Sequence, residues 1–211
     1  MSVKIKDSFG FYAILTDPIR GYDYVANVLA ELEVPFVQLR EKKKSEFEVL
    51  RIAENLSRIF ENTNTKFIIN DYVNIVADAG TDGVHLGQDD MDFYEARDIL
   101  GPNKIIGLST HNPTQTEAAN NLAPDYIGIG PVYKTPTKDI PDPVLGIETM
   151  AKMVKFSKQP AVCIGGISEE KLSDVILGGA KNFCMVRPIC QADDPRREIK
   201  KILEIYNSVK S

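Results

Sequence analysis

Carboxylates end two short apolar runs near the middle of the chain. The run Phe-Ile-Ile at 67–69 leads directly into Asn70 and Asp71. The run at 83–86 leads through a short turn into Asp90. An unpaired buried charge is costly, so packing alone does not explain a carboxylate at the end of a buried strand. Because Mg²⁺ is usually held by one or two carboxylates, with waters and substrate phosphates, Asp71 and Asp90 predict a Mg²⁺ site facing a phosphorylated ligand.

Cationic side chains follow two further apolar runs. Arg40 and Lys42 come directly after one run, and Lys138 lies in the long loop after another. Arginine recognises phosphate through two parallel hydrogen bonds, and lysine supplies a mobile point charge. If the runs end at one mouth, these cations and two neutral donors would surround a pyrophosphate chelated to Mg²⁺. The residues expected there are Gln38, Arg40, Lys42, Asn70 and Lys138.

Helix capping and solvent exposure are the alternative explanations for these charges. Asp71, and likewise Asp89 and Asp90, precede a helical segment whose first turn a carboxylate would cap. Lys42 begins a run of three lysines, and for Lys43 and Lys44 we accept that the run is an ordinary solvated surface. Capping explains one carboxylate per helix. It does not explain why the carboxylates fall beside a cationic cluster.

A second anion site is expected near Gly165 and Gly166, which follow an apolar run and precede a helix capped by Ser168. Glycine lets backbone N–H groups approach an anion, and a helix N-terminus favours its charge. Thr135 and Thr137 would donate hydroxyl groups from the other side. Two phosphate sites at one mouth imply two substrates or one bisphosphate.

The elements that must position these residues are strands and helices in strict alternation. Such a pattern indicates parallel βαβ units, and eight units in 211 residues fit one compact (β/α)₈ barrel, a TIM barrel, as a single domain over 1–211. A doubly wound open sheet is the alternative. The barrel is favoured because polar residues recur at nearly every strand end, and only a barrel brings all the ends to one mouth. The expected strands are 11–15, 35–39, 67–69, 83–86, 104–108, 126–129, 161–164 and 182–186. The expected helices are 22–32, 45–60 with a Ser45–Glu48 capping box, 72–79, 92–100, 113–122, 147–156, a segment after Ser168, and 195–206.

Composition excludes several other classes. A net charge of −5 argues against a broad nucleic-acid-binding surface. No apolar stretch is long enough to span a bilayer, and residues 1–7 lack the apolar core of a signal peptide. Three cysteines without a CxxC pair suit a reduced, cytoplasmic protein. A homo-oligomer is compatible with the sequence.

The chain contains only two histidines, His85 and His111. His85 lies within an apolar strand pattern, which is typical of a hydrogen-bonded core histidine. His111 follows Ser109 at a strand end, where a role in proton transfer is a hypothesis. No nucleophile–base triad is evident.

Taken together in chain order, these motifs closely resemble the thiamine phosphate synthase family. The resemblance covers nearly the whole chain and is highly specific as a set. The motifs are VQLREK at 37–42, IND at 69–71, GVHLGQDD at 83–90, GLSTH at 107–111, GIGPVYKTPTK at 128–138 and IGGI at 164–167.

The resemblance implies a (β/α)₈ barrel that joins two small phosphorylated substrates with Mg²⁺ as cofactor. These are 4-amino-2-methyl-5-hydroxymethylpyrimidine diphosphate and 4-methyl-5-(2-phosphooxyethyl)thiazole, and the products are thiamine monophosphate and pyrophosphate. The bond to pyrophosphate would break first and leave a delocalised pyrimidine cation, which the thiazole nitrogen attacks. Such a reaction needs leaving-group stabilisation rather than acid–base machinery.

The resemblance also implies a role for each matching residue. Asp71 and Asp90 would bind Mg²⁺, and Ser109 would lie beside the reacting pyrimidine. One departure concerns Arg187 and Pro188, where the family usually has small residues. Arg187 would either clamp the thiazole phosphate or point away. The diphosphate would be held by Gln38, Arg40, Lys42, Asn70, Ser109 and Lys138, of which Arg40, Lys42, Ser109 and Lys138 would be catalytic. The thiazole phosphate would be held by Thr135, Thr137, Gly166, Val186 and Arg187.

Three other interpretations of the protein's function remain open from the sequence. They are a thiazole tautomerase of the same superfamily, another phosphate-binding barrel such as a sugar-phosphate isomerase, and a regulatory protein that binds thiamine precursors without turnover. The synthase is favoured because its diphosphate cluster is complete: Arg40, Lys42, Asn70, Asp71, Asp90 and Lys138.

Overall fold

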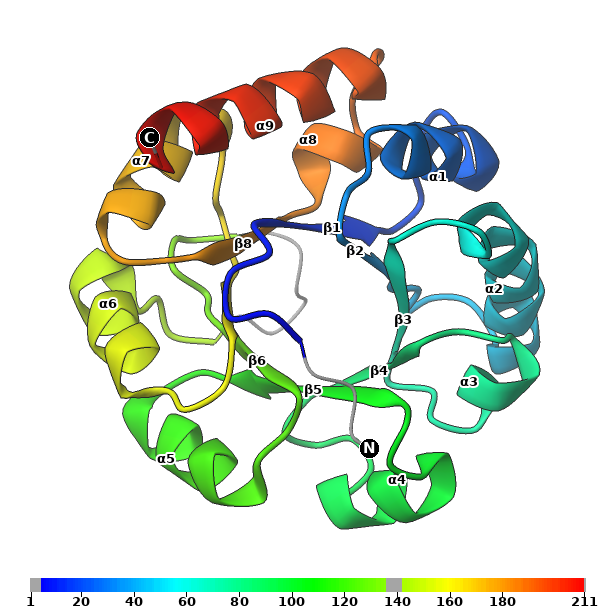
Figure 1. The fold of residues 1–211 in the computed structure, drawn as a ribbon, viewed down its shortest axis with the longest axis horizontal. Helices are drawn as coiled ribbons and strands as arrows, with labels where there is room; N and C mark the ends of the chain where they lie inside the picture. The colour runs from blue at the N-terminus through cyan, green and yellow to red at the C-terminus, as the bar shows by residue number, and fades with distance from the viewer. Residues whose placement is uncertain (1–4, 136–141, 211) are drawn as a thin grey trace.

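Eight parallel strands close into a barrel in chain order (Figure 1). The structure is a computed structural model and describes residues 5–135 and 142–210. The last strand pairs with the first, with Phe183 in register with Phe11, so the sheet has no free edge. The strands are β1 Phe11–Leu15, β2 Phe36–Leu39, β3 Lys66–Asn70, β4 Gly83–Leu86, β5 Ile105–Thr110, β6 Tyr126–Ile129, β7 Ala161–Cys163 and β8 Asn182–Met185.

Helices form a ring around the barrel (Figure 1). Most begin and end close to the predicted positions, and the predicted Ser45–Glu48 capping box is confirmed. The helices are α1 Tyr22–Glu31, α2 Glu46–Phe60, α3 Ile75–Asp78, α4 Phe93–Leu100, α5 Pro113–Leu122, α6 Gly146–Phe156, α7 Glu169–Leu177, α8 Arg187–Cys190 and α9 Pro195–Lys210. Among the described residues, no helix is long and apolar enough to cross a membrane.

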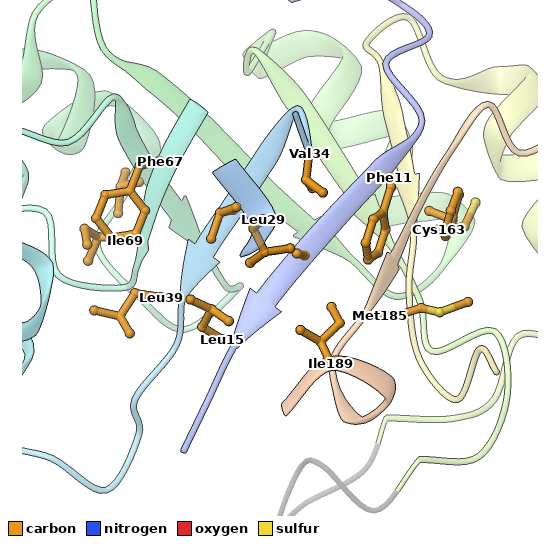
Figure 2. Close-up of a cluster of buried hydrophobic side chains, with 14 of the residues drawn as sticks. Phe11, Leu15, Leu29, Val34, Leu39, Phe67, Ile69, Cys163, Met185 and Ile189 are labelled. Atoms are coloured by element: carbon orange, nitrogen blue, oxygen red, sulfur yellow. The ribbon is translucent and has the colours of Figure 1, made fainter. Parts of the chain in front are cut away.

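The main apolar core lies between the barrel wall and the helices. Successive strand residues point to opposite faces. In β1, Phe11 and Leu15 therefore point outward into this core, while Tyr12 and Ile14 belong to a smaller cluster inside the barrel. Figure 2 shows the outward set around β1, with Phe11 and Leu15 beside Ile189 of α8. The inner cluster fills the barrel below the strand ends.

Three local predictions were wrong or incomplete. The helix expected over 72–79 is only the short α3, because two tight turns follow β3 and Asp71 adopts a left-handed φ of 67°. Ser168 does precede α7, but its side chain makes no capping hydrogen bond. The helix α8, which begins at Arg187, was not expected at all. Its four residues are too few for a periodic pattern to appear in the sequence.

Candidate active site

A cavity of about 860 Å³ opens at the carboxyl ends of the strands. That volume lies near the upper end of the range for small-molecule sites. Thr137 and Lys138 fall outside the described residues, and their predicted roles stay predictions. All other predicted site residues line the cavity: Gln38, Arg40, Lys42, Asn70, Asp71, Asp90, Ser109, Thr135, Gly166, Val186 and Arg187.

Asp71 and Asp90 form a carboxyl pair at the ends of β3 and β4. The Asp71 backbone N–H donates to the carbonyl of His85 in β4 at 2.9 Å, which fixes the turn after β3. The Asp90 carboxylate accepts the N–H of Gly87 at 2.6 Å, which holds its turn in place. Neither side chain caps a helix, because α3 and α4 begin after Asn74 and Asp92. The capping alternative is therefore wrong for both residues.

The two carboxyl groups lie close enough to affect each other's ionisation. Burial, together with the neighbouring Asp90, raises the pKa of the Asp71 carboxyl to about 6, although Lys42 opposes the shift. Burial also disfavours an ionised Asp90, but hydrogen bonds from Asp71 and the Gly87 N–H outweigh it and lower the Asp90 pKa. Two carboxylates this close require a proton or a cation between them.

This donor set fits Mg²⁺. Hard cations of this size are commonly held by one or two carboxylates, with waters and substrate phosphates as the remaining ligands. Within the described part of the chain, no group of three His, Cys, Asp or Glu side chains is placed to bind a metal. Asp71 and Asp90 would therefore have to share such an ion with a phosphorylated ligand.

Two cations from the end of β2 face this carboxyl pair. The Lys42 ammonium forms an ion pair with Asp71 and stays about half exposed. Arg40 lines the cavity, and its guanidinium has no hydrogen-bond or ion-pair partner among residues 5–135 and 142–210. An unpaired guanidinium beside a cavity is suited to bind a phosphate or carboxylate of a ligand.

Glu41, between these two cations, is a buried residue that the sequence analysis missed. Its carboxylate accepts the Asp17 backbone N–H at 2.8 Å and the Tyr22 hydroxyl at 2.6 Å, and it lies 3.4 Å from the Lys44 ammonium. These contacts tie the loop after β2 to the loop after β1. They hold the backbone from which Arg40 and Lys42 reach the cavity. A carboxylate between two functional cations is the sequence signal that points to such an anchor.

Glu41→Ala is expected to destabilise the protein by about 1–2 kcal/mol, because the partly buried Asp17 N–H loses its acceptor and the Tyr22 hydroxyl loses the nearer of its two acceptors. Urea unfolding followed by circular dichroism measures the change. Glu61→Ala, at an exposed position, is the matched control and should leave the midpoint unchanged. Equal midpoints for the two variants would show that Glu41 does not anchor the loops.

The glycines after β7 serve loop packing. Gly165 and Gly166 adopt left-handed φ angles of 100° and 63°. A Cβ on Gly165 would lie 2.5 Å from Pro131, and one on Gly166 would lie 2.5 Å from the carbonyl oxygen of Lys134. Tyr133 N–H donates to the Gly165 carbonyl at 2.9 Å. The loops after β6 and β7 thus touch backbone to backbone, and Gly166 and Thr135 from these loops both line the cavity.

Further cations lie on this side of the cavity. Arg187, the first residue of α8, lines the cavity and is exposed. Lys171 in the first part of α7 also lines it, with its ammonium 4.6 Å from the centre of the Tyr133 ring. The sequence analysis did not select Lys171. The sequence feature that could have identified it is a lysine near the start of a helix that follows a glycine pair.

His111 contacts the loop that follows β6. Its Nδ1–H donates to the carbonyl of Gly130 at 2.7 Å, and Nδ1 lies 3.6 Å from the Asp142 carboxylate. His111 lines the cavity, and its role in proton transfer stays a hypothesis. Ser109 lies at the end of β5, where its hydroxyl oxygen is 2.9 Å from His85 Nε2.

Comparisons with known proteins agree on one family. The family model described as thiamine monophosphate synthase matches residues 12–189. The thiamine-phosphate synthase of Caldicellulosiruptor saccharolyticus is 39% identical over 94% of this chain and 91% of its own. That of Halalkalibacterium halodurans is 37% identical over 95% of each chain.

Solved structures agree as well. The thiamine phosphate pyrophosphorylase from Pyrococcus furiosus superposes with a TM-score of 0.87 at 26% identity, covering 96% of this chain and 98% of that one. The 3-hexulose-6-phosphate synthase from Salmonella typhimurium has a TM-score of 0.71 at 15% identity over 95% and 99% of the chains, and this likeness shows the fold alone.

Proposed function

The chain belongs to the thiamine monophosphate synthase family, and from this we propose how its cavity works. Its activity is that of a thiamine-phosphate synthase, a transferase. The proposed substrates are 4-amino-2-methyl-5-hydroxymethylpyrimidine diphosphate and 4-methyl-5-(2-phosphooxyethyl)thiazole, which give thiamine monophosphate and pyrophosphate. The observation that carries the proposal is the carboxyl pair Asp71–Asp90 in one cavity with the Arg40 guanidinium, which no residue of the described part of the chain pairs.

The diphosphate binds over the ends of β2, β3 and β4. Arg40 offers two parallel N–H donors to its oxygens, and Lys42 exchanges its ion pair with Asp71 for contact with the phosphates. Asp71 and Asp90 would hold Mg²⁺, which supplies positive charge to the departing pyrophosphate. Lys138, outside the described residues, is proposed to add a further cation from the loop after β6.

The thiazole phosphate binds over the ends of β6, β7 and β8. Thr135 and the backbone near Gly166 and Val186 offer neutral donors at one wall of the cavity. Arg187 adds a side chain that no described residue pairs in an ion pair. The proposed site therefore differs from one built of neutral donors alone, because Arg187 can reach the phosphate directly.

The coupling step needs positioning and charge rather than proton transfer. The C–O bond to pyrophosphate breaks, and its electron pair leaves on the pyrophosphate oxygen beside Arg40 and Lys42. The thiazole nitrogen then donates its lone pair to the pyrimidine methylene carbon and forms the new C–N bond. Holding both partners side by side in one cavity supplies much of the rate. A cavity of about 860 Å³ is large enough to hold both.

We further infer the setting in which this chain works. The three cysteines are all free and buried, which suits a reducing cytoplasm. The net charge of −5 supports small phosphorylated molecules, rather than nucleic acid, as its partners.

Arg187→Ala is expected to raise the KM for the thiazole phosphate about tenfold and to leave the KM for the pyrimidine diphosphate unchanged, because the side chain contacts only the monophosphate. Steady-state kinetics with each substrate varied in turn measures both constants. Arg58→Ala, on the exposed face of α2, is the matched control. If the two KM values rise together, Arg187 maintains the structure of the cavity entrance and does not bind the thiazole phosphate specifically.

Pyrophosphate release from purified protein tests the proposed function. The pyrimidine diphosphate is supplied with and without Mg²⁺ and with and without the thiazole phosphate. Release that requires all components, with thiamine monophosphate formed in step, is the expected result. Conversion of a thiazole carboxylate isomer without pyrophosphate release would identify a tautomerase. Tight binding of either ligand without turnover in both assays would identify a regulatory protein.

A further inference from the structure

A row of five polar side chains crosses the inside of the barrel along the cavity. Gln38 Nε2 lies 2.9 Å from the Tyr12 hydroxyl, which lies 2.8 Å from the Tyr126 hydroxyl. The Tyr126 hydroxyl lies 2.9 Å from His85 Nδ1. His85 Nε2 lies 2.9 Å from Ser109 Oγ. Both tyrosines and Gln38 are buried, so these contacts satisfy groups that water does not reach.

The neighbouring strands make room for this row. Gly107 in β5 faces the Tyr126 ring, and a Cβ there would lie 2.1 Å from a ring carbon. Gly128 in β6 faces His85, and a Cβ there would lie 3.3 Å from the imidazole. Glycine weakens a strand interior and often marks a close approach. The rings of His85 and Tyr126 stack at 5.4 Å in the space that the two glycines leave.

Counting donors and acceptors gives the row a direction. Gln38 Nε2 is a donor only, so the Tyr12 oxygen accepts from it, and the Tyr12 proton finds an acceptor in this row only if it points to Tyr126. In that direction the Tyr126 proton is left for His85 Nδ1, which accepts it. The imidazole then carries its proton on Nε2. That proton is donated to Ser109 Oγ, and the Ser109 proton is left to point into the cavity.

We propose that this row is a one-way hydrogen-bond chain in which His85, with its proton on Nε2, positions the Ser109 hydroxyl as a donor to the substrate. His85 is thus a positioning residue and Ser109 the group that touches the ligand. The ligand atom must be an acceptor, such as an unprotonated nitrogen of an aromatic ring. That last point rests on the proposed function, in which the pyrimidine ring lies beside Ser109, whereas the protonation of His85 does not.

The chain orients a donor without supplying a proton. Burial raises the pKa of Tyr12 and of Tyr126, so neither phenol gives up its proton at neutral pH. A ring nitrogen that stays unprotonated leaves the 4-amino group free to donate electrons as the bond to pyrophosphate breaks. A group that protonated the ring would withdraw that support. The arrangement suits a reaction through a pyrimidine cation.

Nitrogen NMR of the two imidazoles tests the direction of the chain without any substrate. The chain has only two histidines, and untagged full-length protein labelled with ¹⁵N therefore shows two imidazole patterns. His85 is expected to carry its proton on Nε2 at pH 7.5. His111 is expected to carry it on Nδ1, because that nitrogen donates to the Gly130 carbonyl. His85→Asn removes one pattern and assigns both.

The opposite result for His85 would overturn the proposal. A proton on Nδ1 would mean that the hydrogen bonds between Tyr12 and Ser109 run the other way and that the Ser109 hydroxyl points inward. A doubly protonated His85 would mean that the row has no single direction. Because this readout needs no turnover, it separates failure of the chain from failure of the proposed function.

A double-mutant cycle tests whether His85 acts through Ser109. His85→Asn is expected to lower kcat about tenfold, and Ser109→Ala to lower it by at least as much. The double variant is expected to be no slower than Ser109→Ala alone, because the hydroxyl that His85 positions is already absent. His85→Gln, whose amide N–H reaches the place of Nε2–H, is expected to recover part of the activity. Losses that simply multiply in the double variant would assign His85 a structural role instead.

Discussion

Asp71→Asn is expected to abolish coupling, with kcat lowered by about a thousandfold. The substitution keeps the shape of the side chain but removes the charge with which the Asp71–Asp90 pair would hold Mg²⁺ beside the diphosphate. Pyrophosphate release at saturating substrates and a series of Mg²⁺ concentrations measures the loss. Added Mg²⁺ is not expected to restore the rate, because one of the two carboxylates is missing.

The fold of this variant should survive, and pH linkage gives the reason. Burial and the neighbouring Asp90 raise the pKa of Asp71 from its ordinary value of 3.8 to about 6 in the folded state, so ionised Asp71 costs stability. This cost is absent well below pH 4 and grows until the pH passes about 6. Asp71→Asn removes it, so at pH 7 without metal the variant should melt no lower than the parent protein.

Asp89→Asn is the matched control for this experiment. Asp89 is the exposed neighbour of Asp90 and does not line the cavity, so its loss should leave the rate and the Mg²⁺ requirement unchanged. Near-normal turnover by Asp71→Asn would show that the proposed metal site is wrong. An equal loss in both variants would show that net charge at the mouth matters more than the carboxyl pair.

Arg40→Ala is expected to lower kcat by about a hundredfold to a thousandfold, because it removes a preorganised donor pair from the departing pyrophosphate. Arg40→Lys should recover only part of the rate, since lysine keeps the charge but lacks the planar fork. Single-turnover measurements with both substrates bound separate the chemical step from binding. The melting temperature serves as the check on folding.

Lys43→Ala provides the comparison for the Arg40 variants. Lys43 carries the same charge nearby but is exposed and does not line the cavity, so its removal should change kcat less than twofold. Full activity in Arg40→Ala would exclude this guanidinium from leaving-group stabilisation. A comparable loss in Lys43→Ala would point to a general field of positive charge instead of a specific contact.

The barrel could be predicted because its signal is local and repeated. Each strand is an apolar run bounded by polar residues, and each helix has its own apolar spacing, so most element boundaries fell within two residues. The predictions failed for segments whose sequence shows no helical or strand periodicity. The segment 72–79 has a helical composition. However, Asp71 has a left-handed φ and tight turns follow β3, so the helix begins only at Ile75. The four residues of α8 are too few to carry a pattern.

Much of the site could also be predicted, because parallel strands in a barrel all end at one mouth. The positions of Arg40, Asp71 and Asp90 at strand ends were enough to place them in one cavity, and they line it. What the sequence did not show is which polar groups are already paired. Lys42 holds Asp71, and the Gln38 amide nitrogen faces Tyr12 rather than the ligand. Pairing depends on distances between strands far apart in the chain.

The sequence by itself determined the family, the barrel and the strand ends at which charged groups meet, because each of these follows from local pattern and chain order. Only the tertiary structure decided that the Asp71 and Asp90 carboxyl groups shift each other's pKa, and that Glu41 is buried as an anchor. It also decided that His85 links Tyr126 to Ser109. These properties arise from burial and from hydrogen bonds across different strands, which set the protonation of each group only once the barrel has closed.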